Sequence, residues 1–489
     1  MSNTINRKNI IISVFTLGCK TNYYESGQIV NWLLTAGYEA IEGLKWADIY
    51  VINTCAITKE AESKSRQAIA RARKINPDCV CFIVGCASHK NAEQFKSIDN
   101  VQLILGNENK LHVVECIDKY IIDNFSINHS TNAVKPSYTI DTHDSTTQPD
   151  CMSDIPREVV QSHSNEQRTV QDSLTQLVHE SNAGVNSADT NALLTDYPCY
   201  THLIDATQGH TRAFIKIQDG CNNYCSYCIV PYLRSRSRSR SLDSIMSEVN
   251  ANSSADEIVL IGIDISQYGL DINTTLAQLL TAMQTYKGRV RLGSLYCNCI
   301  DSTLLESMSI NACKHFHLSL QSGCDRTLIS MNRRYTTQQY ADCVQLIRSY
   351  YPNAGITTDI IVGFSGESDE DFNSTVQFVR RMQFSDIHIF PYSPREGTRA
   401  YGLPRPTSAV VKDRVNTLTA VKRALKREFI ARQLALGKAT VLIEEYKNGY
   451  YVGYTDNYVK VFVKSPHTIT GIVECTLLNC DDNGIYAQP

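Results

Sequence analysis

The sequence lacks any apolar run long enough to cross a lipid bilayer, which takes about 20 residues. Its first apolar run, Ile10–Phe15, is also too short to serve as a signal peptide. These absences predict a cytoplasmic protein with no membrane partner, in a compartment where disulfides are rare. The 18 cysteines are therefore expected to bind metal or to lie buried as thiols.

The chain also lacks a strong net charge, because the formal value is −3 over 489 residues. Overall charge therefore does not indicate a nucleic-acid partner, and any surface that binds one has to be local. The length predicts about two to four domains.

What the sequence does contain is three closely spaced cysteines, Cys221, Cys225 and Cys228, which we call the loop cysteines. Iron–sulfur clusters are bound by thiolates, and three thiolates on one loop can hold three corners of a four-iron cube. The fourth iron then keeps an open position where a small molecule can bind and react. The alternative is a structural zinc site, which normally needs four ligands in paired spacing. No second C-x2-C follows, and the nearest spare histidine, His210, lies well before the loop.

The first 122 residues alternate apolar runs with helical patterns, as in an α/β doubly wound parallel sheet. The predicted strands are Ile10–Thr16, Ile49–Asn53, Val80–Val84 and Val101–Leu105, and the predicted helices are Asn22–Ala36 and Glu60–Lys74. Three further cysteines, Cys19, Cys55 and Cys86, each follow the end of a different strand. Parallel strands finish at one edge of a sheet, so these strand-end cysteines are expected to meet and to hold a second three-thiolate cluster. The alternative is coincidence among 18 cysteines.

Residues 123–206 are rich in serine, threonine, asparagine and aspartate, with scattered apolar residues. Such a segment buries too little apolar surface to offset the entropy of ordering it. We therefore expect a mostly disordered linker, and Cys151 and Cys199 within it are given no role.

Repeated strand–helix units in residues 207–436 predict a partial (β/α) barrel. The predicted strands are Arg212–Gln218, Glu257–Ile263, Arg289–Leu295, His315–Leu320, Ile356–Val362 and Asp386–Phe390. Active sites of such barrels lie at the C-terminal strand ends, and the loop cysteines follow the first of these strands. Residues 437–489 contain about four or five short strands, which predict a small barrel with a hairpin turn at Asn448-Gly449.

Four arginines alternate with serine after the loop cysteines: Arg234, Arg236, Arg238 and Arg240. In an extended chain this spacing places all four guanidinium groups on one side. Arginine suits phosphate and carboxylate contacts, so this arginine segment is expected to bind an RNA backbone or a substrate carboxylate. The alternative is a solvated basic loop.

Two sets of motifs resemble known enzyme families. The C-x3-C-x2-C loop, with Tyr227 before its last cysteine, resembles the signature of the radical S-adenosylmethionine (SAM) enzymes. The strand-end motifs resemble those of the methylthiotransferases, which carry two clusters: T-L-G-C-K at Thr16–Lys20, N-T-C at Asn53–Cys55 and G-C at Gly85-Cys86. The resemblance implies a methylthiotransferase N-terminal domain in residues 1–122, a radical SAM barrel in 207–436 and a TRAM-like RNA-binding domain in 437–489.

The resemblance also implies the cofactors, which are two [4Fe–4S] clusters and SAM. In the family, SAM binds the open iron of the cluster on the loop cysteines, and one electron cleaves it to give a 5′-deoxyadenosyl radical. The residues expected at the SAM site are Tyr227, Gly262, Asp264, Gln321 and Gly363. Glycine there would let the backbone approach a ligand closely, and the alternative for each glycine is ordinary turn chemistry.

Members of this family act on threonylcarbamoyladenosine or isopentenyladenosine in tRNA, or on an aspartate of a ribosomal protein. The pattern at Thr16–Ser26 and the arginine segment look most like the threonylcarbamoyladenosine type. The implied reaction replaces C2–H of adenine 37, in the anticodon loop, with C2–SCH3, and needs an external one-electron donor such as a flavodoxin or ferredoxin. The alternative from a different class is a non-catalytic, metal-containing RNA-binding protein.

The sequence departs from the family pattern at two places near the expected site. Tyr296-Cys297 stand where Glu-Pro is common, and Ser365 stands where proline is usual. The first departure removes a carboxylate that would be expected to contact cofactor or substrate.

Overall fold

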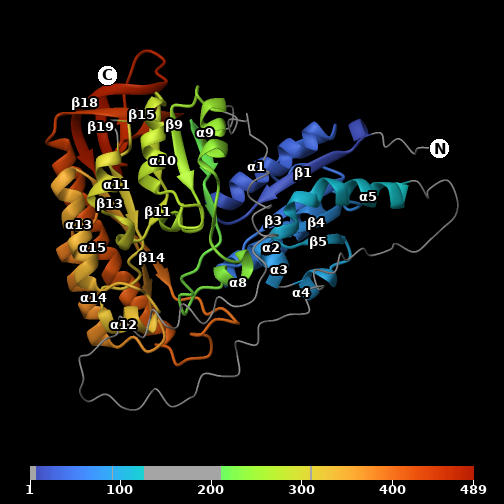
Figure 1. Cartoon of the computed structure of the whole chain (residues 1–489), viewed down its shortest axis with the longest axis horizontal. Coiled ribbons are helices and arrows are strands. Elements are labelled where there is room, and N and C mark those ends of the chain that lie inside the picture. The colour runs from blue at the N-terminus through green and yellow to red at the C-terminus, as the bar shows by residue number, and fades with distance from the viewer. Residues whose placement is uncertain (1–6, 91, 126–210, 309–310) are drawn as a thin grey trace.

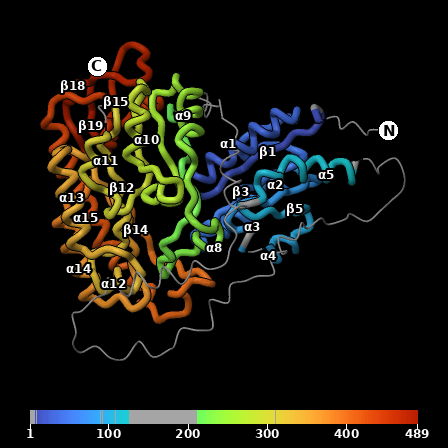
Figure 2. The backbone as a smooth tube through the Cα atoms, in the orientation of Figure 1, coloured from blue at the N-terminus to red at the C-terminus, as the bar shows by residue number. Residues whose placement is uncertain are grey.

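The computed structural model describes residues 7–90, 92–125, 211–308 and 311–489 (Figure 1). Figure 2 traces the same backbone, with the N-terminal part beside the central part and the C-terminal strands at one end of the latter. The predicted linker lies outside the described residues from 126 onward. Among the described helices, none is both long and apolar enough to cross a membrane.

The N-terminal sheet has five parallel strands in the order β2-β1-β3-β4-β5. The strands are β1 (Ile11–Thr16), β2 (Glu39–Glu42), β3 (Ile49–Thr54), β4 (Val80–Gly85) and β5 (Val101–Leu105). Helices α1 (Lys20–Thr35) and α5 (Val113–Phe125) cover one face, and α2 (Lys59–Ile75) covers the other. The predicted doubly wound sheet is confirmed. Strand β2 was not predicted, because its half-exposed residues form no apolar run.

The central part has parallel strands in two sheets, one ordered β10-β9-β6 and the other β11-β12-β13-β14. The strands are β6 (Arg212–Lys216), β9 (Glu257–Ile261), β10 (Arg289–Leu292), β11 (Ser294–Leu295), β12 (His315–Leu318), β13 (Gly355–Val362) and β14 (Asp386–Pro391). The strand predicted at Arg289–Leu295 is interrupted at Gly293, so β10 pairs with β9 whereas β11 pairs with β12. Gly293 thus carries the chain from one sheet to the other, and the result is the partial barrel that was predicted.

Helices cover the outer face of this partial barrel (Figure 1). They include α9 (Leu242–Ala251), α10 (Leu276–Ala282), α11 (Ser302–Ser307), α12 (Asp325–Ser330), α13 (Thr337–Tyr350), α14 (Asp369–Met382) and α15 (Ser408–Leu434). Phe316, Leu318 and Ile360 on the strands join helix side chains in one large core. Successive strand residues point to opposite faces, so the intervening His317 and Asp359 lie on the inner face of the barrel.

The C-terminal strands form a closed barrel in the order β15-β16-β17-β19-β18, as predicted. They are β15 (Lys438–Lys447), β16 (Tyr450–Thr455), β17 (Lys460–Val463), β18 (Gly471–Asp481) and β19 (Gly484–Gln488). Asn448 and Gly449 both have positive φ, +52° and +82°, which suits the tight hairpin expected there. The barrel is fixed to the central part by Asn457, whose side chain donates to the Asn353 carbonyl at 2.8 Å.

Candidate active site

The strand-end cysteines come together at one edge of the N-terminal sheet. Cys19 follows β1 and precedes α1, Cys55 follows β3, and Cys86 follows β4 and begins α3 (Cys86–Lys90). Strand β3 pairs with both β1 and β4, so the C-terminal ends of these three strands are neighbours. Burial raises the pKa of Cys55 to about 11, and the nearby thiols of Cys86 and Cys19 add to the rise. Gly18 lies against this site, because a Cβ there would be 3.0 Å from the Cys55 sulfur.

The loop cysteines lie between β7 (Gln218–Asp219) and α8 (Val230–Arg234) of the central part. Burial raises the pKa of Cys221 to about 11 and that of Cys228 to about 12, and in both cases Cys225 contributes. The three thiols are therefore close enough to act on one another. As free thiols, Cys221 and Cys228 would be protonated at neutral pH, so a bound metal would have to supply the charge that stabilises their thiolates.

A single metal ion and an iron–sulfur cluster need different spacings of the thiols. Among the residues that the structure describes, only His317, Asp359 and His388 bring three ligand atoms close enough to hold one ion. Neither set of cysteines does. Two sulfurs bound to one tetrahedral zinc would lie only about 4 Å apart, since Zn–S is about 2.3 Å. Wider spacing is what a cluster requires, because each thiolate then binds a different iron.

Short helix α8 connects the two sets of cysteines. It begins two residues after Cys228, and its Leu233 packs in one apolar cluster with Cys86. Asn107, which follows β5, donates to the Leu233 carbonyl at 2.8 Å and lies 3.5 Å from the Cys86 sulfur. Helix α8 thus begins beside one candidate cluster site and ends against the other, and Figure 1 shows it next to α2 and α3.

Asp264 is a predicted cofactor residue from another element that the structure places beside the loop cysteines. Its Oδ2 accepts hydrogen bonds of 2.6 Å from the side chains of Asn223 and Gln267, and lies 3.9 Å from the Cys221 sulfur. The side chain of Gln218 accepts from the Asp264 N–H at 2.8 Å. These contacts hold the carboxylate beside the candidate cluster.

The two predicted glycines are close to protein atoms in the structure. A Cβ at Gly262 would lie 2.8 Å from the Gln218 side chain, and one at Gly363 would lie 2.4 Å from Val411 of α15. Close packing against other protein atoms is therefore enough to explain why glycine occupies both positions. Gln321, in contrast, has φ +72° without being glycine, a conformation that costs about 1 kcal/mol or more and is concentrated at functional sites. Tyr227 packs edge-on against Phe364.

Tyr296, noted in the sequence only as a departure from the family pattern, and Arg333, which was not predicted, both lie beside Cys225. The Tyr296 hydroxyl lies 3.4 Å from the Cys225 sulfur, and Arg333 Nη1 lies 3.6 Å from the same sulfur. The Arg333 guanidinium lies over the Tyr296 ring at 3.9 Å and donates to its hydroxyl. Hydrogen bonds to cluster sulfurs tune the reduction potential, so this pair is placed to influence a cluster held by Cys225.

The arginine segment does not have the predicted geometry. Arg234 ends helix α8 and is buried, and Arg240 is buried beside Glu248 with a 2.5 Å ion pair. Arg238 is half-buried, and Arg236 is the exposed member. The prediction of four arginines on one side of an extended chain is wrong, because Arg234 lies in a helix and carboxylates elsewhere in the fold bind Arg234, Arg238 and Arg240.

Glu25 on α1 is the centre of a buried ion-pair network between the N-terminal and central parts. Its carboxylate contacts Lys110 at 2.5 Å, Lys216 at 2.8 Å and Arg234 at 2.7 Å. Asp219 pairs with Lys216 at 2.7 Å and with Arg234 at 3.1 Å. Burial raises the pKa of Glu25, but the three cations outweigh it and hold that pKa well below its usual range.

This network has more positive than negative charge. Arg238 also pairs with Asp219, at 3.5 Å, so four cations share the carboxylates of Glu25 and Asp219. The Cys86 thiol acts on the pKa of both Arg234 and Lys110. Excess positive charge beside Cys86 favours an anionic, thiolate-bound cluster there.

We expect Glu25→Gln to destabilise the protein by about 3 kcal/mol or more, because it leaves buried cations without their carboxylate. Urea unfolding of the variant measures the loss. Glu39→Gln, at an exposed position of β2, is the matched control and should change the free energy of unfolding by less than about 0.5 kcal/mol. Equal stability of the two variants would contradict the structural role of the network.

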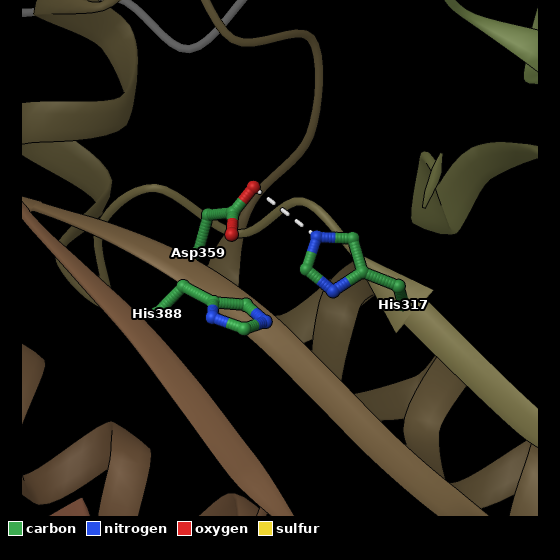
Figure 3. Close-up of side chains that lie close together, drawn as sticks. All are labelled: His317, Asp359 and His388. Atoms are coloured by element: carbon green, nitrogen blue, oxygen red, sulfur yellow. Dashed lines mark hydrogen bonds and ion pairs between the residues drawn. The ribbon is translucent and has the colours of Figure 1, made fainter. Parts of the chain in front are cut away.

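Inner-face side chains of the partial barrel form a second polar group, which Figure 3 shows. His317 on β12 has Nδ1 2.9 Å from the Thr357 hydroxyl and Nε2 3.2 Å from Asp359 Oδ2. His388 on β14 lies beside them, and the ligand atoms of His317, Asp359 and His388 are within 4.8 Å of one another. We call these three residues the inner-face group.

Comparison with known proteins follows the same division of the chain. Residues 215–379 match the Radical SAM superfamily, and residues 11–106 match a model described as Uncharacterized protein family UPF0004. In fold, the chain resembles the radical S-adenosylmethionine methyltransferase TsrM from Kitasatospora setae, with a TM-score of 0.51 and 13% identity over 78% of this chain and 74% of that one. The protein is thus a radical SAM enzyme.

Its relatives define the family more closely. The chain is 31% identical to the threonylcarbamoyladenosine tRNA methylthiotransferase MtaB of Bacillus subtilis (strain 168), over 96% of this chain and 93% of the relative. It is 30% identical to MtaB of Aquifex aeolicus (strain VF5), over 91% and 95%. A tRNA-2-methylthio-N(6)-dimethylallyladenosine synthase of Pelotomaculum thermopropionicum is 29% identical over 95% and 94%. The chain belongs to the radical SAM tRNA methylthiotransferases, which makes tRNA its substrate class and SAM and a [4Fe–4S] cluster its cofactors.

Proposed function

We propose that this enzyme converts N6-threonylcarbamoyladenosine at position 37 of tRNA to its 2-methylthio derivative. The observation that carries the proposal is that helix α8 connects two sets of three cysteines, since it begins after Cys228 and packs against Cys86. Methylthio transfer needs one site that makes a radical and another that gives sulfur, and two neighbouring clusters meet that need. The threonylcarbamoyl group is proposed because it is part of the names of the relatives at 31% and 30% identity.

In this proposal the loop cysteines hold the cluster that binds SAM. Bound there, SAM and one electron from a flavodoxin-like or ferredoxin-like donor supply the radical that removes the C2 hydrogen, which is neither acidic nor a leaving group. Asp264 is positioned beside Cys221 to orient a bound ligand, and Arg333 and Tyr296 donate toward Cys225. The strand-end cysteines would hold a second [4Fe–4S] cluster, which would supply the sulfur, and a second SAM would supply the methyl group.

The C-terminal barrel and Arg236 are proposed to contact the tRNA. Arg236 is the exposed member of the arginine segment, and arginine suits phosphate contact. Arg234 and Arg240 are committed to buried ion pairs and are left out of this surface.

Nucleoside analysis of tRNA tests the proposed function. Cells that lack such an activity should gain 2-methylthio-N6-threonylcarbamoyladenosine when they express this protein, with an equal loss of the unmodified nucleoside. Mass spectrometry of digested tRNA measures both. A variant with all three loop cysteines replaced by alanine should leave the tRNA unchanged. Appearance of 2-methylthio-isopentenyladenosine instead would show that the proposed substrate is wrong.

A further inference from the structure

Lys20 is a cation beside the strand-end cysteines for which the described residues provide no carboxylate partner. It follows Cys19 directly and is the first residue of α1. Its ammonium lies over the Phe214 ring of β6, 6.0 Å from the ring centroid, and the side chain is exposed. Within residues 7–90, 92–125, 211–308 and 311–489, no carboxylate forms an ion pair with it.

The charges around Lys20 are already paired with one another. Arg212 pairs with Glu257 at 2.5 Å and also with Glu444, and Arg291 pairs with Glu257 at 2.9 Å. These two cations and two carboxylates balance. Lys20 therefore adds one unbalanced positive charge to this wall of the partial barrel.

The inner-face group lies around the same region. Burial and Arg291 lower the pKa of His315 well below its usual range, and the charges of His317, Lys20 and His388 lower it further. Lys20, His317 and His388 thus all lie near enough to His315 to lower its pKa, and the His315 imidazole stays neutral near pH 7. Both ring nitrogens of His317 are taken by Thr357 and Asp359, so a metal ion would have to break an existing hydrogen bond. The group suits hydrogen bonding to a polar organic ligand better.

We propose that Lys20 is a specificity residue that binds the threonine carboxylate of N6-threonylcarbamoyladenosine, with the inner-face group beside its hydroxyl and urea groups. The inference rests on the proposed function. The carboxylate is the only charged group that distinguishes this nucleoside from the apolar isopentenyl form, so one cation that lacks a carboxylate partner is an efficient discriminator. Because Cys19 and Lys20 are adjacent, the contact would also hold the base beside the strand-end cysteines.

Binding of short RNAs to the cluster-loaded, full-length protein tests this role. The probes are two anticodon stem-loops that differ only in carrying threonylcarbamoyladenosine or adenosine at position 37. We expect the wild-type protein to prefer the modified stem-loop, and Lys20→Met to lose about 10- to 100-fold in affinity for it, as for a hydrogen bond between charged groups. Affinity for the unmodified stem-loop should stay the same. Lys20→Arg should keep the preference, because it keeps the charge.

The controls separate the role of Lys20 from the choice of substrate. Lys74→Met, at an exposed position near the end of α2, should keep the preference. Iron content and thermal unfolding of each variant check that the clusters and the fold are intact. Undiminished preference in an intact Lys20→Met would overturn the specificity role alone. A wild-type protein that neither prefers nor modifies the threonylcarbamoyl substrate would overturn the proposed function.

Discussion

Replacement of Cys225 with alanine is expected to abolish formation of 5′-deoxyadenosine from SAM, with a loss of at least about 1,000-fold. Cys225 is the central loop cysteine and is buried. A side chain from the protein surface therefore cannot replace its thiolate as a ligand of the cluster. The Tyr296 hydroxyl and the Arg333 guanidinium also point at its sulfur, and alanine would leave both without an acceptor there. Chromatography of anaerobic reactions with SAM and dithionite measures the product.

Cys480→Ala is the matched control for this experiment. Cys480 is an exposed cysteine on β18 of the C-terminal barrel, far along the chain from either set of cluster cysteines. We expect its deoxyadenosine formation to equal that of the wild type. If Cys225→Ala still formed deoxyadenosine at the wild-type rate, the assignment of the radical-generating cluster to the loop cysteines would be wrong.

The cysteines could be found from sequence because local rules place them. The loop cysteines are close in the chain, so no knowledge of the fold was needed to group them. The strand-end cysteines are far apart in sequence, but each follows an apolar run, and parallel strands finish at one edge. Strand periodicity alone was therefore enough to predict that Cys19, Cys55 and Cys86 would meet.

The arginine segment shows where such rules fail. Its spacing would place the four guanidinium groups on one side only of an extended chain. In the structure, however, Arg234 ends a helix and Arg240 is buried. Their partners, Glu25 and Glu248, lie on α1 and α9, and nothing in the local sequence indicates those contacts. Ion pairs between distant elements decided the outcome, and these depend on the whole fold.

Tyr296 was visible in the sequence only as a departure from a family pattern. Its position near Cys225 depends on the break at Gly293, where the chain leaves one sheet and joins the next. Arg333 reaches the same sulfur from the turn after α12. The sequence therefore predicted the grouping of the cysteines well and their hydrogen-bonding surroundings poorly, because the grouping follows local spacing and strand order, whereas the surroundings depend on tertiary contacts.

Replacement of Cys55 with alanine is expected to separate the two halves of the reaction. Cys55 belongs to the strand-end cysteines, so its loss should empty the second cluster site, and methylthiolated nucleoside should fall below detection. The cluster on the loop cysteines, which precede α8 in the chain, would keep all three of its thiolate ligands. Deoxyadenosine formation should therefore persist within about twofold of the wild type. Iron analysis should find about half of the wild-type content, since one of two equal clusters is lost.

Mass spectrometry of tRNA digests and chromatography of the same reactions measure both products. Continued methylthiolation by Cys55→Ala would exclude the strand-end cysteines as the source of sulfur. Loss of deoxyadenosine together with the methylthio product would mean that the two sites cannot act independently.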